Sequence, residues 1–292
     1  ESSVAVSAPF YAPSDMYITR MSRVADIGDE GGLPDYGITF YPCKEVSAYF
    51  DHLIVSEEIQ VAFENAEEEF CEQYTLYYES GPRDWEYCRK ELDIFIPKGT
   101  SLGTVGGGRD QKAVDVGIYD FRMTPHTLAN PDRWQFYAEG NLPYVACALD
   151  YFPQDIQESY EALIPRSEAP VCGTVVQDLS GTAQGNWVPE GTSIHIGAEN
   201  AFLALVHDNY DPSQAVFSIG TAVETIDYGE YTFTEKEEGL INRDFSDLLP
   251  SELYCYEELE PSGTGNTFDG IVLVQMTSEN TLSIEGQEKN SR

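Results

Sequence analysis

Residues 94–120 read IFIPKGTSLGTVGGGRDQKAVDVGIYD, and this stretch decides the fold that we expect for the chain. Apolar residues alternate with polar ones before and after the glycines, which is the period of a β-strand. Residues 97–100 have the composition of a turn. The stretch therefore predicts a strand, a turn, a second strand, a glycine loop at 103–108 and a third strand.

Residues 49–53, YFDHL, predict an earlier strand that belongs with this stretch. Together the two segments resemble the lysostaphin-like zinc endopeptidases, which cut peptidoglycan cross-links. In that family a Tyr-x-His-Leu strand precedes a turn, a Gly-x-x-Ile-Gly segment and a His-x-His strand. Residues 12–18, APSDMYI, are similar to a further strand of the family. The positions that fit are Tyr49, His52, Leu53, Gly99, Leu102 and Gly103.

The zinc ligands of that family are missing from this chain. The His-x-His position falls on residues 113–115, AVD, and the metal-binding His-x3-Asp has no counterpart. The resemblance therefore implies the fold without the activity: no catalytic residue is expected, and Tyr49, His52 and Asp115 are expected to line a vestigial groove. Two alternatives stay open there. His52 is a hydrogen-bonded strand histidine, or Asp115 joins Asp51, His52 or Asp120 in holding calcium.

Charge is the extreme feature of the composition. The 292 residues include 51 acidic and 16 basic ones, a net charge of −35. Such a surface repels the phosphates of nucleic acids and of anionic lipids, so no nucleic-acid partner is expected. Proteins of salt-loving organisms and calcium-loaded extracellular proteins both have this composition. A hydrophobic fraction of 41% with 19 Tyr and 14 Phe indicates a globular chain rich in strands.

The six cysteines form an even set without a C-x-x-C pair, which favours disulfides over a metal cluster. We therefore expect an extracellular or cell-surface protein whose signal peptide has been removed, with no membrane span. Buried free thiols in a cytosolic protein are the alternative. The predicted pairs are Cys71–Cys88, Cys172–Cys255 and Cys43–Cys147.

Two helices and one domain boundary are expected. The first helix begins at Ser56, an N-cap residue, and its apolar face runs from Ile59 to Phe70. It opens an insertion at 57–90. The second helix covers 153–164 and ends at Pro165, where we place the boundary. Residues 1–165 are then a peptidase-like antiparallel β-sheet or barrel-sandwich domain, and 166–292 an antiparallel β-barrel or sandwich. The fold class is mainly β.

Two motifs in the second half suggest ligands. In 207–212, HDNYDP, oxygen-bearing side chains alternate, so Asp208 and Asp211 are a candidate calcium site; a strand-ending turn is the other interpretation. Residues 185–187, GNW, are similar to the Gly-x-Trp of lipocalin-like barrels, which implies an enclosed apolar pocket. A core tryptophan near a turn is the alternative for Trp187.

The function expected from the sequence is non-catalytic. The chain is predicted to be a secreted or cell-surface protein with a binding or structural-assembly role, whose partner is a protein, a glycan, calcium or further copies of itself. No resident cofactor is expected apart from calcium. The competing hypotheses are a zinc peptidase-like cell-wall hydrolase and a small-ligand carrier using the second domain.

Overall fold

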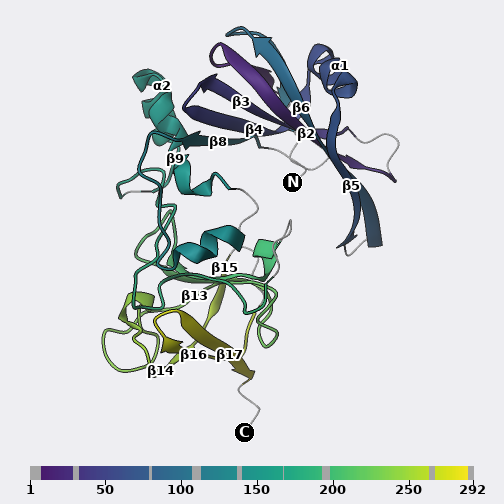
Figure 1. Cartoon of the computed structure of the whole chain (residues 1–292). Helices are drawn as coiled ribbons and strands as arrows, with labels where there is room; N and C mark the ends of the chain where they lie inside the picture. Colours follow the sequence, from purple (N-terminus) through teal and green to yellow (C-terminus); the bar gives the residue numbers. More distant parts are fainter. Residues whose placement is uncertain are drawn as a thin grey trace. The chain divides into compact units, whose positions relative to one another are not determined.

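A computed structural model describes residues 8–28, 33–78, 81–106, 113–136, 140–166, 168–192, 198–262 and 267–288. The fold is mainly β, with 45% strand, 14% helix and antiparallel sheets, as the sequence predicted. The chain divides into two compact units (Figure 1). Unit 1 consists of Glu1–Thr124 and Val145–Asp150, and unit 2 of Pro125–Tyr144 and Tyr151–Arg292.

Unit 1 is built on a nine-stranded sheet whose main path runs β1-β7-β4-β3-β2-β6-β5, with β8 pairing both β4 and β9. Strands β2, β3, β4 and β6 lie side by side in Figure 1. The strands are β1 (Pro9–Tyr11), β2 (Met16–Asp26), β3 (Asp35–Cys43), β4 (Val46–Val55), β5 (Glu68–Tyr78), β6 (Gly81–Ile96), β7 (Ser101–Val105), β8 (Asp115–Asp120) and β9 (Val145–Ala146).

The order predicted for residues 94–120 is confirmed. β6 ends at Ile96, a turn closed by the bond from Thr100 N to the Pro97 carbonyl (3.1 Å) follows, and β7 and β8 complete the stretch. The predicted glycine loop began too early, since Gly103 lies within β7, and residues 107–112 lie outside the described residues. In β2 the side chains of Met16, Ile18 and Met21 are all buried. A register shift between Ile18 and Arg20 brings Met21 back to the core face.

Helix α1 (Glu57–Asn65) begins after Ser56, as predicted, and buries Ile59 and Phe63. Phe63 packs edge-on against Tyr36 of β3, with ring centroids 5.6 Å apart. The predicted apolar face was too long: Phe70 lies in β5 and is 37% exposed. The chain leaves the helix because Ala66 adopts an extended conformation. The expected insertion thus includes a hairpin, β5–β6, whose second strand pairs along β2 within the main sheet.

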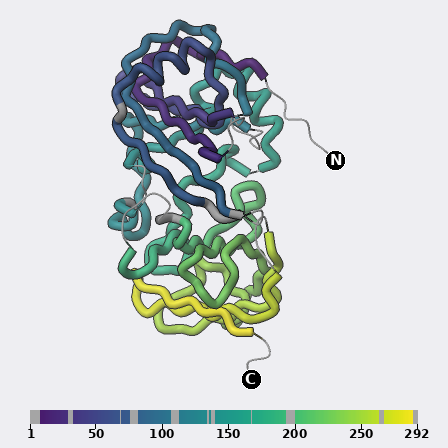
Figure 2. The backbone as a smooth tube through the Cα atoms, turned by 90° about the vertical axis from the view of Figure 1, so that its right-hand side faces the viewer, coloured from purple at the N-terminus to yellow at the C-terminus, as the bar shows by residue number. Residues whose placement is uncertain are grey.

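Unit 2 is a sandwich of two antiparallel sheets around one core. Leu205, Phe217 and Tyr231 of the first sheet pack in the same cluster as Tyr256 and Val274 of the second. The yellow strands β16 and β17 form the last hairpin (Figure 2). The five-stranded sheet contains β10 (Gly185–Trp187), β11 (Leu203–His207), β12 (Ala215–Ile219), β13 (Gly229–Thr232) and β15 (Glu260–Ser262), and the three-stranded sheet β14 (Leu253–Glu257), β16 (Gly270–Ser278) and β17 (Thr281–Glu288).

The remaining elements are helical and short. The second predicted helix is confirmed as α2, although it stops three residues earlier than expected. Besides α1, the helical elements within the described ranges are α2 (Gln154–Glu161) and the 3-10 helices η1 (Pro131–Phe136), η2 (Leu142–Tyr144), η3 (Ala148–Tyr151), η4 (Ala198–Ala201) and η5 (Phe245–Asp247).

The division into units differs from the boundary predicted after Pro165. Residues 125–144 and 151–165 belong to unit 2. The reason is a polar anchor: Arg133 pairs with Asp178 at 3.6 Å and lies over the Trp187 ring at 4.2 Å. Composition alone does not reveal such an anchor, because it joins residues far apart in the chain.

Residues 173–177 do not form a strand. The segment instead bonds to β11 through a side chain. Gln177 Nε2 donates to the His207 carbonyl, and His207 N donates to Gln177 Oε1, both at 2.8 Å. The Gln177 side-chain amide thereby satisfies the backbone N–H and carbonyl of His207, which a neighbouring strand would otherwise do.

The cysteines confirm one predicted pair and correct the other two. Cys71 and Cys88 lie opposite each other in β5 and β6 and form a disulfide. Cys147 and Cys172 are also disulfide-bonded, whereas Cys43 and Cys255 are free thiols. The predicted pairs Cys43–Cys147 and Cys172–Cys255 are therefore wrong. Cys43 is exposed at the end of β3, and Cys255 is held in the β14–β16 ladder.

Two disulfides fit an oxidising, extracellular environment. No helix in the described part of the chain is long and apolar enough to cross a membrane.

Removal of the Cys71–Cys88 bridge should destabilise unit 1. The bridge closes a separation of 17 residues, so its loss in a Cys71→Ser/Cys88→Ser variant should cost about 3 kcal/mol. The measurement is a urea titration followed by hydrogen exchange of peptides from β2, β5 and β6. Cys43→Ser, which alters a free exposed thiol, is the control. Equal urea midpoints for the double variant and this control would contradict the assignment.

Candidate functional site

His52 lies where β4 changes its partner. Residues up to Asp51 pair with β8, and residues from Leu53 onward pair with β7. A register shift against β3 falls at the same place, and His52 has φ 68°, a left-handed conformation that is uncommon outside glycine. The His52 carbonyl accepts from Gly106 N at 3.0 Å. This bulge leaves two residues, Asp51 and His52, between the buried Phe50 and Leu53.

The His52 ring bridges two carboxylates. Its Nδ1 lies 2.6 Å from Asp35 Oδ2, at the start of β3, and its Nε2 lies 3.5 Å from Asp115 Oδ2, at the start of β8. The Asp35 side chain is 16% exposed and that of Asp115 is 61% exposed. The arrangement runs from a nearly buried carboxylate through the imidazole to the surface, and we call it the Asp35–His52–Asp115 chain.

Tyr49, the third residue predicted for the groove, lies over β8. The register places it opposite Gly117, and Asp51 opposite Asp115. A Cβ atom on Gly117 would come within 2.0 Å of the Tyr49 ring, so only glycine leaves room for the ring there. Tyr49 also packs against Tyr119, with centroids 5.9 Å apart. The structure thus joins His52 to Asp115 and seats Tyr49 on the neighbouring strand.

The surroundings of His52 favour its protonated form. Burial alone would lower the pKa of His52, but the hydrogen bond and charge of Asp35, with the charges of Asp115 and Asp51, raise that pKa above its usual value. Asp35 Oδ1 is buried without a hydrogen-bond partner among the described residues. The imidazolium is therefore the group that compensates the Asp35 charge.

The residues of this site do not fit a catalytic zinc ion. Asp35 and Asp115 lie against opposite nitrogens of the His52 ring, so their oxygens cannot share one tetrahedral centre with a single ring nitrogen. Asp120, another predicted cation ligand, pairs with Arg122 at 2.6 Å. In the portions of unit 1 that are described, three candidate ligand atoms do not gather at one point.

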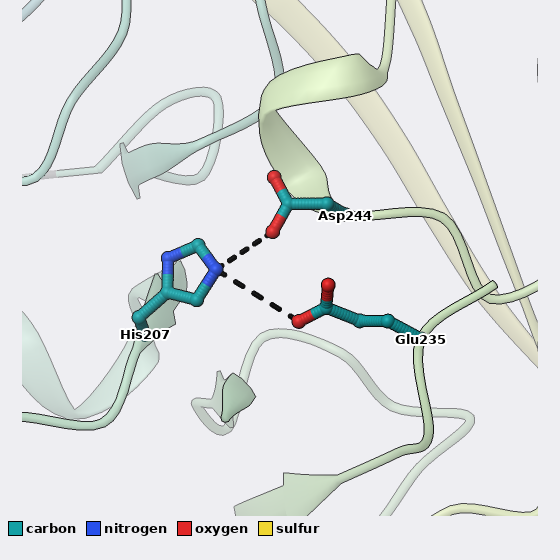
Figure 3. A group of neighbouring side chains, drawn as sticks. All are labelled: His207, Glu235 and Asp244. Carbon is teal, nitrogen blue, oxygen red and sulfur yellow. Dashed lines mark hydrogen bonds and ion pairs between the residues drawn. The ribbon is translucent and has the colours of Figure 1, made fainter. Parts of the chain in front are cut away.

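Unit 2 holds a second group, which the sequence analysis missed. His207 ends β11, Glu235 follows β13, and Asp244 is the N-cap of η5 (Figure 3). His207 Nε2 lies 2.7 Å from Asp244 Oδ2 and 3.9 Å from Glu235 Oε1. Within the described residues this is the one group of three metal-ligating side chains whose ligand atoms all lie within 4.8 Å. Only the fold brings these residues together.

The charges of this group are strongly coupled. Its hydrogen bond to Asp244 raises the pKa of His207 despite burial. Burial alone would raise the pKa of Asp244, but the bonds from His207 and Ser246 lower it to about 2. Burial and the Asp244 charge raise the pKa of Glu235. His207 is the basic side chain that both acids share.

The predicted calcium residues Asp208 and Asp211 cap the turn after β11. Asp208 Oδ1 accepts from Tyr210 N (2.6 Å) and Asp211 N (2.7 Å). Asp211 Oδ1 accepts from the backbone N and the hydroxyl of Ser213, bonds that lower its pKa. Both side chains are engaged as expected of the strand-ending turn that was the alternative interpretation.

Trp187 is 8% exposed and its Nε1 donates to the Ala183 carbonyl at 2.8 Å. A groove of about 360 Å³ lies on the same sheet, with Val206, Val216 and Ser218 among its lining residues, but Trp187 does not line it. The tryptophan therefore has the environment of a core residue near a turn.

Protein-family profiles, curated proteins and solved structures contain no match to this chain. The class that fold and site define is thus an antiparallel β protein of two units, each with a histidine held by carboxylates.

Replacement of Asp35 by Asn should lower the pKa of His52, because the raising charge is removed. Since the folded pKa is raised, the pair's stabilisation is fully present below about pH 6.5 and is lost as pH rises through the folded value. Asp35→Asn should therefore destabilise unit 1 by roughly 1 kcal/mol near pH 6, after solvent screening, and less near pH 9.

NMR titration of the four histidine rings measures the shift, and urea unfolding at the two pH values measures the stability. His207, in the other unit, serves as the internal control. An unchanged His52 titration in Asp35→Asn would show that the hydrogen bond does not set its charge.

Proposed function

We propose that this protein is a non-catalytic, exported binding protein whose unit 1 holds a positively charged group of a partner protein. The observation that carries the proposal is the Asp35–His52–Asp115 chain. It occupies the position where the resemblance to lysostaphin-like peptidases implies a zinc centre, and its donor set does not fit zinc. A partly exposed carboxylate, beside a histidine that is already bonded to a second acid, is a surface to which a cationic group can bind.

The charges of the Asp35–His52–Asp115 chain favour a cationic partner. Asp115 is 61% exposed, and Asp51 lies opposite it in the β4–β8 ladder. His52 is already committed to Asp35 at 2.6 Å, so it neutralises Asp115 only in part from 3.5 Å. A lysine, an arginine or a terminal amine can approach the exposed carboxylate and form a charge-assisted hydrogen bond.

The whole-molecule charge supports the same class of partner. A net charge of −35 attracts basic proteins over long distances and repels anionic ones. The two disulfides support an exported setting. Long-range attraction would raise the association rate, while the groove would supply the local contacts that select the partner.

Binding of an oligolysine peptide to the full chain tests this function. Asp115→Asn should weaken binding about three- to tenfold, the loss of one charge-assisted contact of roughly 1 kcal/mol. The matched control is Asp155→Asn, which removes the same charge from an exposed position of α2 in unit 2. Isothermal titration at two salt concentrations measures both. Equal weakening by the two variants would mean that only the general charge attracts the peptide.

A peptidoglycan-clearing assay with added Zn²⁺ tests the competing hydrolase hypothesis. We expect no clearing by the full chain. Zinc-dependent clearing that His52→Ala abolishes would overturn the non-catalytic proposal.

A further inference from the structure

The group formed by His207, Glu235 and Asp244 in unit 2 has the composition of a metal site. We propose that it binds one divalent cation of the zinc type through His207 Nε2 and one carboxylate oxygen from each acid. The three ligand atoms lie within 4.8 Å of one another and converge in Figure 3. One imidazole nitrogen with two carboxylate oxygens suits zinc, whereas calcium and magnesium prefer ligand sets made of oxygen alone.

The distances between the ligand atoms fit this ion after small movements. Bonds of about 2.0–2.2 Å place tetrahedral ligand atoms roughly 3.3–3.6 Å apart. His207 Nε2 lies 2.7 Å from Asp244 Oδ2 and 3.9 Å from Glu235 Oε1, so the observed separations lie on either side of that range. Side-chain shifts of less than about 1 Å would complete the site.

The backbone and neighbouring groups orient all three ligands. His207 pairs with Ala215 in the β11–β12 ladder. Asp244 Oδ1 accepts from Ser246 N at 2.7 Å and from the Ser246 hydroxyl, which turns Oδ2 toward the imidazole. The Glu235 carboxylate accepts a backbone hydrogen bond from Ala215. Such outer hydrogen bonds are the usual support of metal ligands.

The charge of the group is not balanced by nearby basic side chains. Lys236 pairs with Glu257 at 2.9 Å, and Arg243 pairs with Asp247. In the described part of the chain neither carboxylate of the group has a lysine or arginine partner; both depend on His207. A divalent cation would neutralise the two carboxylates together.

Buried aromatic residues adjoin both acids along the chain. Phe245 follows Asp244, and Phe233 comes two residues before Glu235. Both rings pack with Tyr256, with Phe233–Tyr256 centroids 4.8 Å apart. The Glu235 side chain is 35% exposed, so a metal ion can reach the group from solvent.

Equilibrium dialysis of the full chain against Zn²⁺ at about pH 8 tests the site, with excess Ca²⁺ and Mg²⁺ to occupy the acidic surface; alkaline pH favours binding because the metal displaces the imidazole proton. Metal content by mass spectrometry should give one zinc per chain. His207→Gln and Glu235→Gln should each weaken zinc binding at least about tenfold, and zinc should raise the melting temperature of the unaltered chain but not of these two variants.

The matched control is His52→Gln, the same substitution at the histidine of unit 1, which should keep the zinc. Loss of zinc from this control to the same extent, or retention of no more zinc than calcium by the unaltered chain, would overturn the site. If His207→Gln does not fold, the zinc content of Glu235→Gln tests the site in its place. The proposed partner site lies in unit 1 and the proposed metal site in unit 2. The effect of Asp115→Asn on peptide binding is therefore independent of the zinc measurements.

Discussion

The divided pairing of β4 is the constraint on which unit 1 depends. One edge of β4 pairs with β3 throughout, while the other edge pairs first with β8 and then with β7. The junction needs an extra residue, and that residue is His52. Because the bulge turns the ring outward, a side chain that strand alternation would bury reaches Asp35 and Asp115 instead. The backbone pairing therefore creates the site.

Scarcity of cations shapes both units. With 16 basic residues against 51 acids, most carboxylates must stay in water, and the few that are withdrawn from it need a specific partner. Arg133 fills that role for Asp178, whose side chain is fully buried. Histidines fill it for Asp35 and Asp244. An imidazole compensates a carboxylate only while it is protonated, so these two pairs tie local charge balance to pH in a way that the arginine pair does not.

Local patterns predicted the fold better than they predicted the sites. Strand alternation predicted the order of β6, β7 and β8, and the Cys71–Cys88 bridge was predicted because both cysteines lie in one polar insertion. The contact between His52 and Asp115 could be predicted from the sequence, because the two residues lie on predicted strands that are adjacent. The contact between His52 and Asp35 could not be predicted, because a bulge, and not strand alternation, orients the His52 ring toward Asp35. Glu235 and Asp244 meet His207 only through the sandwich, and among 51 acids no sequence pattern singles them out.

The backbone at His52 and the ion pair that it makes are energetically linked. A left-handed conformation costs a non-glycine residue about 1–2 kcal/mol, and a hydrogen bond to a charged group contributes roughly 1.5–3 kcal/mol. These magnitudes nearly cancel, so the hydrogen bond between the His52 imidazolium and Asp35, at 2.6 Å, offsets the strain of the bulge. When the ring loses its proton, the strained backbone stays and much of its compensation goes. The charge on His52 therefore stabilises the bulge that lies beside Asp115, and the same carboxylates would attract a cationic partner.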